Sequence, residues 1–174
     1  MRAKNVIHRE LDRIDMNLVR ALQDNCRVSM TDLAEKVGLS VTPCAERVRR
    51  LERDGFILGY HAHLNPHAFG QALLVFVEIK LTAKSGAMFE AFKREVRKLP
   101  NVLECHLVSG DFDYLIKARI PEMKAYRRLL GDMLLGLPGA RESRSYIVME
   151  EIKESLALSI EDPEPEPKAG SRRA

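Results

Sequence analysis

Four arginines, Arg47, Arg49, Arg50 and Arg53, fall within one short segment of the chain. Guanidinium groups bind phosphate oxygens and guanine edges with two parallel hydrogen bonds, so such a cluster favours contact with a polyanion. A solvated helix whose arginines pair with Glu46 or Glu52 would give the same local charge pattern. The cluster therefore predicts either a nucleic-acid contact or an ordinary charged surface.

The residues just before the arginines fit the start of a helix. Ser40 and Thr42 can cap a helix, and Pro43 suits the first turn, where its missing N–H is not needed. A helix N-terminus also presents free N–H groups to anions, so Ser40 and Thr42 are candidates for phosphate or base contacts, and we include Pro43 in the same DNA-contacting set. Arg47, one turn into the helix, is best placed to reach a guanine. We assign Arg49, Arg50 and Arg53 to phosphates and Glu46 to a cytosine amine.

A second group of polar residues forms the turn Ser109-Gly110-Asp111-Phe-Asp113. It offers two carboxylates, backbone N–H groups around Gly110 and the apolar neighbour Leu107. A free amino acid needs this mixture, because its ammonium, carboxylate and side chain each require a different partner. The alternative is a hairpin turn whose aspartates bind their own backbone.

Metal and catalytic sites have little support. His61 and His63 are two residues apart, but two histidines are not a ligand set, and a solvated surface is the favoured interpretation. Cys26, Cys44 and Cys105 are too far apart for a zinc ribbon or a redox pair, and we expect Cys44 to be a small core residue. No P-loop, GxGxxG, GxSxG or HExxH motif occurs, so an enzyme is not expected.

Composition describes an ordinary globular protein. The chain has 174 residues, 45% hydrophobic and 30% charged, with a net charge of +3. Most of that excess lies in residues 1–65, whereas residues 66–162 are neutral. The chain has no apolar run near 18 residues and no signal peptide, so we expect a cytoplasmic protein that does not contact a membrane.

Three helices are predicted before residue 56. The first carries Leu11, Ile14, Leu18 and Leu22 at helical spacing, with Asp12 as a possible N-cap. The second begins at Ser29 in a capping-box pattern with Asp32 and ends at Gly38. The third has Thr42 as its proposed cap and ends at Gly55. Its predicted buried stripe consists of Val41, Cys44, Val48 and Leu51. A strand at 57–64 follows, so the region has the pattern of a helix-turn-helix.

The rest of the chain predicts the element order βαββαβ. Strands are expected at 73–81, 102–109, 112–120 and 144–152, with helices at 85–98 and 122–136. This order is that of a ferredoxin-like fold, whose two helices cover one face of the sheet. Leu74 and Phe76 would then form an apolar uncovered face, which a second copy of the chain could cover.

Several sequence motifs resemble those of the Lrp/AsnC transcription regulators. They are Leu39–Cys44, Arg47–Arg53, Asp54–Ile57, Gly59-Tyr60, Leu64–Pro66, Glu104–Tyr114 and Tyr146–Glu150. The similarity spans residues 11–157. It implies a bacterial, nucleoid-associated regulator that binds double-stranded DNA, forms dimers and octamers or larger assemblies, and binds an amino acid between its C-terminal domains.

The resemblance also implies which residues bind the amino acid, with leucine the expected effector and no other cofactor. These residues are Leu107, Ser109, Gly110, Asp111, Asp113, Met123, Tyr146, Ile147 and Val148, with Asp113 chosen to meet the ammonium.

The expected architecture is α+β with two domains. A winged helix-turn-helix domain spans 11–64, a linker 65–72 and a ferredoxin-like effector and oligomerisation domain 73–157, before a disordered tail at 161–174. Two other functions stay open: an architectural DNA-wrapping protein that ignores ligands, and a regulatory domain of an amino-acid-metabolism enzyme.

Overall fold

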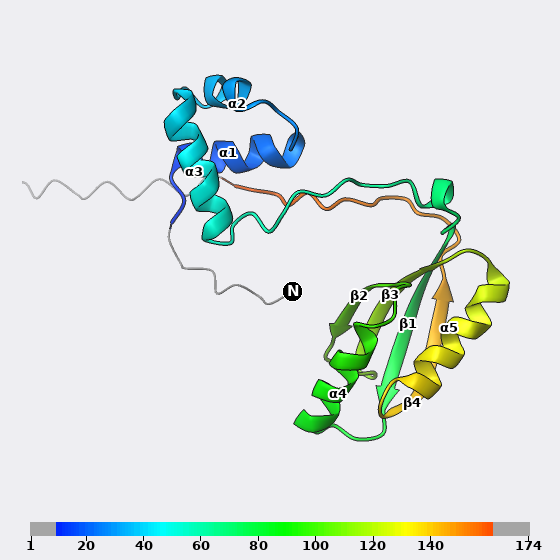
Figure 1. The fold of residues 1–174 in the computed structure, drawn as a ribbon. Coiled ribbons are helices and arrows are strands. Elements are labelled where there is room, and N and C mark those ends of the chain that lie inside the picture. The colour runs from blue at the N-terminus through cyan, green and yellow to red at the C-terminus, as the bar shows by residue number, and fades with distance from the viewer. Residues whose placement is uncertain (1–9, 162–174) are drawn as a thin grey trace, which may run out of the picture. The chain divides into compact units, whose positions relative to one another are not determined.

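A computed structural model describes residues 10–161, apart from the side chains of Asp132 and Leu134, so most of the predicted tail lies outside it. The chain forms two compact units (Figure 1). Among the described residues, the first contains the three helices and the chain up to Ala62 together with residues 155–161, and the second spans His63–Glu154. By their contacts, residues 155–157 lie with the first unit. No described helix is long and apolar enough to cross a membrane.

The first unit is built from α1 (Arg13–Asp24), α2 (Met30–Lys36) and α3 (Val41–Arg53). Asp12 caps α1 by accepting a hydrogen bond from the Asp15 N–H, and Ser29 caps α2 in the same way through Asp32. Gly38 turns the chain between α2 and α3 with φ +70°, a conformation that favours glycine. Of the predicted interior, Leu18, Leu22, Cys44, Val48 and Leu51 are buried in one core, which also contains Leu33 and Ala34. The predicted Leu11 and Ile14 are partly buried against this core.

The start of α3 differs from the prediction. Ser40, not Thr42, is the N-cap, because the Cys44 N–H donates to the Ser40 carbonyl and closes the first turn two residues early. Pro43 still lies in the first turn, where its missing N–H leaves no helix hydrogen bond unmade. This shift also corrects Val41, which is 44% exposed and is not part of the buried stripe.

The predicted strand at 57–64 is wrong. Gly55 ends α3 with φ +82°, as expected, but the following residues are extended without a strand partner in the described chain. Alternating apolar residues favour an extended backbone, but a strand forms only where a second segment supplies hydrogen bonds. Leu58 and Leu64 are accordingly exposed, and the Tyr60 hydroxyl donates to Glu52 over 2.9 Å. The predicted linker contains a short 3₁₀ turn, η1 (Pro66–Phe69).

The second unit has the predicted βαββαβ order. Its elements are β1 (Leu73–Leu81), α4 (Gly86–Val96), β2 (Val102–Leu107), β3 (Tyr114–Ile120), α5 (Met123–Gly136) and β4 (Ala140–Ile147). The sheet is antiparallel in the order β2-β3-β1-β4, as expected for a ferredoxin-like fold. β4 begins and ends earlier than predicted because its register is set by β1, where Leu81 pairs with Ala140.

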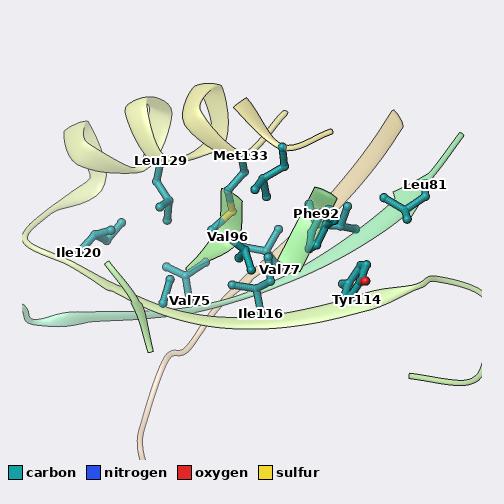
Figure 2. Packing of buried hydrophobic residues seen from close by; sticks show 13 residues of the cluster. Val75, Val77, Leu81, Phe92, Val96, Tyr114, Ile116, Ile120, Leu129 and Met133 are labelled. Atoms are coloured by element: carbon teal, nitrogen blue, oxygen red, sulfur yellow. The ribbon is translucent and has the colours of Figure 1, made fainter. Parts of the chain in front are cut away.

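Both helices cover one face of this sheet, as predicted. Val75 and Val77 of β1 pack beneath Phe92 of α4 and Met133 of α5 (Figure 2). The rings of Phe92 and Tyr114 stack with centroids 4.0 Å apart. The predicted positions of Leu74 and Phe76 on the other side of β1 follow from this alternation.

That other side, which we call the open face, is not the apolar surface expected from Leu74 and Phe76. Residues directly opposite each other in an antiparallel pair share a face, so Lys117 and Arg119 of β3 lie beside Phe76 and Leu74. On β4, Tyr146 lies opposite Phe76. The open face is therefore mixed in character, with charged groups beside the half-buried Phe76. Leu74, expected to be uncovered, is only 6% exposed and is already buried within the chain.

Candidate functional site

The predicted DNA-contacting residues lie together on the solvent side of α3. Pro43, Glu46, Arg47, Arg49, Arg50 and Arg53 line one shallow hollow of about 470 Å³. Ser40 and Thr42, at the start of the same helix, are exposed, and the Ser40 hydroxyl makes no capping hydrogen bond. Because α3 follows α2 after a tight turn, the arrangement is that of a recognition helix.

Two acidic residues, Asp15 of α1 and Asp12 at its N-cap, bind arginines of α3. Asp15 is completely buried and accepts hydrogen bonds from Arg47 at 2.8 Å and Arg50 at 3.3 Å. The Asp12 carboxylate, besides capping α1, accepts from Arg47 at 2.6 Å. Both carboxylates bind Nη1 of Arg47, and within residues 10–161 the hydrogen bonds of this guanidinium all involve that one nitrogen. The hydrogen bonds to Asp12 and Asp15 also raise the pKa of Arg47.

Asp113 is engaged by its own unit. It is 3% exposed, and one carboxylate oxygen accepts from the Leu81 N–H at 2.8 Å while the other pairs with Lys84 at 2.9 Å. Burial by itself raises the pKa of Asp113, but these two partners outweigh it and hold the pKa below its usual value. The Asp113 backbone also bonds to Ile79 and Val108, so this residue fixes the turn to the end of β1.

Asp111 differs from Asp113 in being exposed and lining a hollow. This hollow, of about 220 Å³, contains side chains of both charges: Glu78, Lys80, Asp111, Phe112, Glu142, Ser143 and Arg144. Glu78 and Arg144 are direct partners across β1 and β4, and the Tyr146 hydroxyl donates to Glu78 over 3.0 Å. The hollow thus combines acceptors for an ammonium with donors for a carboxylate.

One chain does not bring all the predicted effector residues to this hollow. Leu107 lines a different one beside α4 and β2, and Met123 is exposed at the start of α5. Tyr146 and Ile147 are exposed near the end of β4, and Val148 continues the pairing of β4 with β1 through the Leu74 carbonyl. Ser109 and Gly110 are exposed in the turn.

Several residues of both sites were missed by sequence reasoning. Asp12 was recognised as a cap but not as a partner of Arg47, and Asp15 falls on the first helix beside an apolar stripe. Its helical spacing from Asp12 was the available signal, since the two share one face. Glu78 and Arg144 could be found only after the strand register was known. Among the described residues, no three potential ligands of a metal ion cluster together.

The sequence matches two described families, one for each unit. Residues 11–57 match a winged helix-turn-helix DNA-binding domain, and residues 74–158 match the Lrp/AsnC ligand-binding domain. The leucine-responsive regulatory proteins of Escherichia coli and Salmonella typhimurium are each 57% identical over 152 residues, which cover 87% of this chain and 93% of theirs.

Solved structures agree with these matches. A transcriptional regulator of Neisseria meningitidis in complex with L-Met has a TM-score of 0.80 at 34% identity, covering 86% of this chain and 97% of that one. A feast or famine regulatory protein of M. tuberculosis complexed with L-methionine has a TM-score of 0.79 at 31% identity, covering 87% of this chain and all of the other. With a helix-turn-helix unit and a ligand-binding unit in one chain, this protein is a DNA-binding transcription regulator, not an enzyme, and it belongs to the Lrp/AsnC family.

Proposed function

We propose that the protein regulates transcription in the bacterial cytoplasm, associated with the nucleoid, by binding DNA through α3 under the control of leucine or a similar apolar amino acid. The observation that carries the DNA contact is the basic hollow on α3, whose arginines come from one exposed helical side. Leucine is supported by the relatives named for it, and the L-methionine complexes support an apolar amino acid more generally.

Each candidate DNA-contacting residue has a proposed role. Arg47 reads a base with its Nε and Nη2 atoms while Asp12 and Asp15 hold Nη1. Because these bonds already restrict the side chain in the free protein, Arg47 loses less rotamer freedom when it binds DNA. Arg49, Arg50 and Arg53 bind phosphates, as do Ser40 and Thr42 at the helix N-terminus. Glu46 accepts a hydrogen bond from a cytosine amine, and Pro43 stiffens the first turn.

The amino acid binds at the hollow beside the turn. Asp111 or Glu78 meets the ammonium, and Arg144 or Lys80 meets the carboxylate. Asp113 supports the site by holding the turn on β1. A free amino acid also needs an apolar slot, which a second copy supplies from Leu107, Met123, Ile147 and Val148, with Tyr146 and the Ser109-Gly110 backbone at the edge.

Assembly of copies is therefore part of the proposed site. Phe76 and Tyr146 face each other on the open face, and Tyr146 is 44% exposed. We place dimer contacts there and expect dimers to form octamers. The effector acts by changing the equilibrium between assembly states that hold the recognition helices differently.

The function is tested with double-stranded DNA selected from a random pool by the protein itself. Affinity is measured by fluorescence anisotropy, and assembly size by light scattering, with and without each of the twenty amino acids. We expect an apolar amino acid, with leucine the first candidate, to change either quantity by 5-fold or more. A factor of 5 is the lower end of the range by which one ligand usually changes the affinity for another. If no amino acid changes either quantity, the protein is a ligand-independent DNA-binding protein instead.

A further inference from the structure

The chain passes between its two units twice, once between Ala62 and His63 and again between Glu154 and Ser155. The second passage belongs to a segment without helix or strand, residues 148–160, which we call the C-terminal tether. Both of its ends make specific hydrogen bonds inside the unit in which they lie.

The first end is fixed on the open face of the sheet. Glu151 binds the Arg119 guanidinium with two hydrogen bonds, at 3.0 and 2.6 Å, and Arg119 is only 7% exposed. Glu154 accepts from Lys117 at 3.0 Å. Lys117 lies opposite Phe76, which in turn lies opposite Tyr146, the residue that bonds to Glu78 at the proposed effector hollow. Three side chains, Lys117, Phe76 and Tyr146, therefore separate Glu154 of the tether from Glu78 at that hollow.

The second end is fixed on α1. The Gln23 amide bonds in both directions with the Leu158 backbone, donating to its carbonyl at 2.8 Å and accepting from its N–H at 2.9 Å. Arg20 donates to the Ile160 carbonyl from Nε at 3.2 Å and from Nη2 at 2.9 Å. The same helix carries Asp15, which holds Arg47 and Arg50 of the recognition helix.

The tether is short and its second end is easily released. Between Glu154 and Leu158 the chain spans at most about 14 Å, at roughly 3.5 Å per residue. A movement that carries the first end beyond this reach pulls on α1 or breaks the bonds to Gln23. Those bonds are exposed, and Leu156 and Leu158 are 84% and 75% exposed, so little apolar burial holds this end. Contacts of this kind open at low free-energy cost.

We propose that the C-terminal tether transmits the state of the amino-acid site to the recognition helix, through Glu154 and Lys117 at one end and Gln23 and Arg20 at the other. This inference rests on the proposed function, since it needs an amino acid that changes DNA binding. It adds the physical element by which the two sites affect each other. That element is the tether, whose attachment to the sheet is firm and whose attachment to α1 is weak.

Two truncations of the full chain test the tether. One ends after Glu161 and keeps the tether, and the other ends after Glu154 and removes the α1 attachment. The measured quantity is the ratio of DNA affinities with and without leucine, or whichever amino acid acts on the intact protein. We expect the longer variant to keep the ratio of the intact chain and the shorter one to bring it to about 1. A shorter variant that binds DNA more weakly but keeps the ratio overturns the proposal, because the segment then only stabilises the unit.

Point variants cover the case in which the shorter chain does not fold. Gln23→Ala removes both bonds to Leu158, while Asp24→Ala, at an exposed neighbouring position, is the matched control. We expect the ratio to fall at least threefold in Gln23→Ala and to stay constant in Asp24→Ala. An unchanged ratio in Gln23→Ala refutes the tether. An intact protein that responds to no amino acid refutes the proposed function instead.

A cross-link reports on the tether without DNA. Cys26 and Leu158 line one groove of the first unit, so Leu158→Cys places two thiols within reach of a short thiol cross-linker. We expect efficient linkage without amino acid, a severalfold change in yield with it, and no linkage when Cys26 is replaced by serine. A yield that leucine leaves constant, or a failure to link in either state, contradicts the proposal.

Discussion

Single residues in this protein gain their roles from the carboxylates beside them. Arg47 and Arg50 could be picked from the sequence because their type and spacing suit a recognition helix. Asp15 could not be assigned to them, because it lies more than thirty residues earlier and its burial depends on how α1 packs against α3. The same holds for Asp113, which the sequence places in an ordinary turn and the fold places against the Leu81 N–H. The charge of a side chain can be taken from the sequence, but its hydrogen-bonding partners depend on how the elements pack.

Replacing Arg47 separates base reading from phosphate binding. Arg47→Ala should weaken binding to the selected DNA by about 1–3 kcal/mol and relax the preference at one base position. Arg50→Ala should weaken all sequences alike and reduce the salt dependence by about one unit, because it removes one phosphate contact. Anisotropy titrations against specific and random DNA at several salt concentrations measure both. Equal, sequence-independent losses in the two variants would mean that Arg47 is not the base reader.

Replacing Asp113 should lower the free energy of unfolding, whereas replacing Asp111 should change the response to leucine. Asp113→Ala leaves the buried Leu81 N–H without its acceptor and should lower the free energy of unfolding by about 1–3 kcal/mol at pH 7. Because folding lowers the pKa of Asp113, its contribution is complete above the unfolded-state pKa of about 3.9 and disappears as the pH falls through the folded-state value. The difference between wild type and Asp113→Ala should therefore shrink in acid, as followed by urea denaturation at pH 7, 5 and 3.

Asp111→Ala is the matched control for stability and the direct test of the hollow. Its exposed side chain should leave the free energy of unfolding unchanged while the leucine response is lost. If Asp111→Ala responds normally, Asp111 is not the ammonium partner, which leaves Glu78 of the same hollow, or Asp113 as the resemblance implied.

At the scale of elements, periodicity predicted what lies inside better than where elements end. The buried residues of α1 and α2 and the alternation of β1 follow from spacing, because each element buries one side. The N-cap of α3 could not be chosen from the local pattern, because Ser40 and Thr42 are both good caps. Only the first helical hydrogen bond, from the Cys44 N–H to the Ser40 carbonyl, distinguishes them. The strand at 57–64 failed for lack of a partner strand, which no local pattern encodes. The polar character of the open face emerged only from the register that places Lys117 opposite Phe76.

The open face should respond to a charge placed at its centre. Phe76→Glu puts a carboxylate against Tyr146 and beside Lys117, where it opposes burial by a second copy. We expect wild type to sediment as a dimer or larger at micromolar concentration and Phe76→Glu to form smaller species. Leu135→Glu, at a position on α5 that is 91% exposed, should leave the assembly unchanged. A monomeric wild type would remove the open face from the assembly.

At the scale of the whole molecule, the protein has two cores with no residue in common. One lies among the three helices of the first unit and the other between the sheet and its two helices. Each core can therefore lose packing without direct damage to the other. The charge distribution agrees with this division, since the positive excess lies mainly in residues 1–65, where the proposed DNA contacts are.

Removing packing from one core should consequently leave the other intact. Leu51 is fully buried beneath the recognition helix, so Leu51→Ala should cost about 2–5 kcal/mol in the first unit and weaken DNA binding. Ile116→Ala makes the equivalent cavity in the sheet and should weaken amino-acid binding instead. Hydrogen exchange followed by mass spectrometry resolves the two units, since peptides from each report its own opening. Loss of protection in both units of both variants would show that they unfold as one, and the amino acid would then act on DNA binding through overall stability and not through a connecting segment.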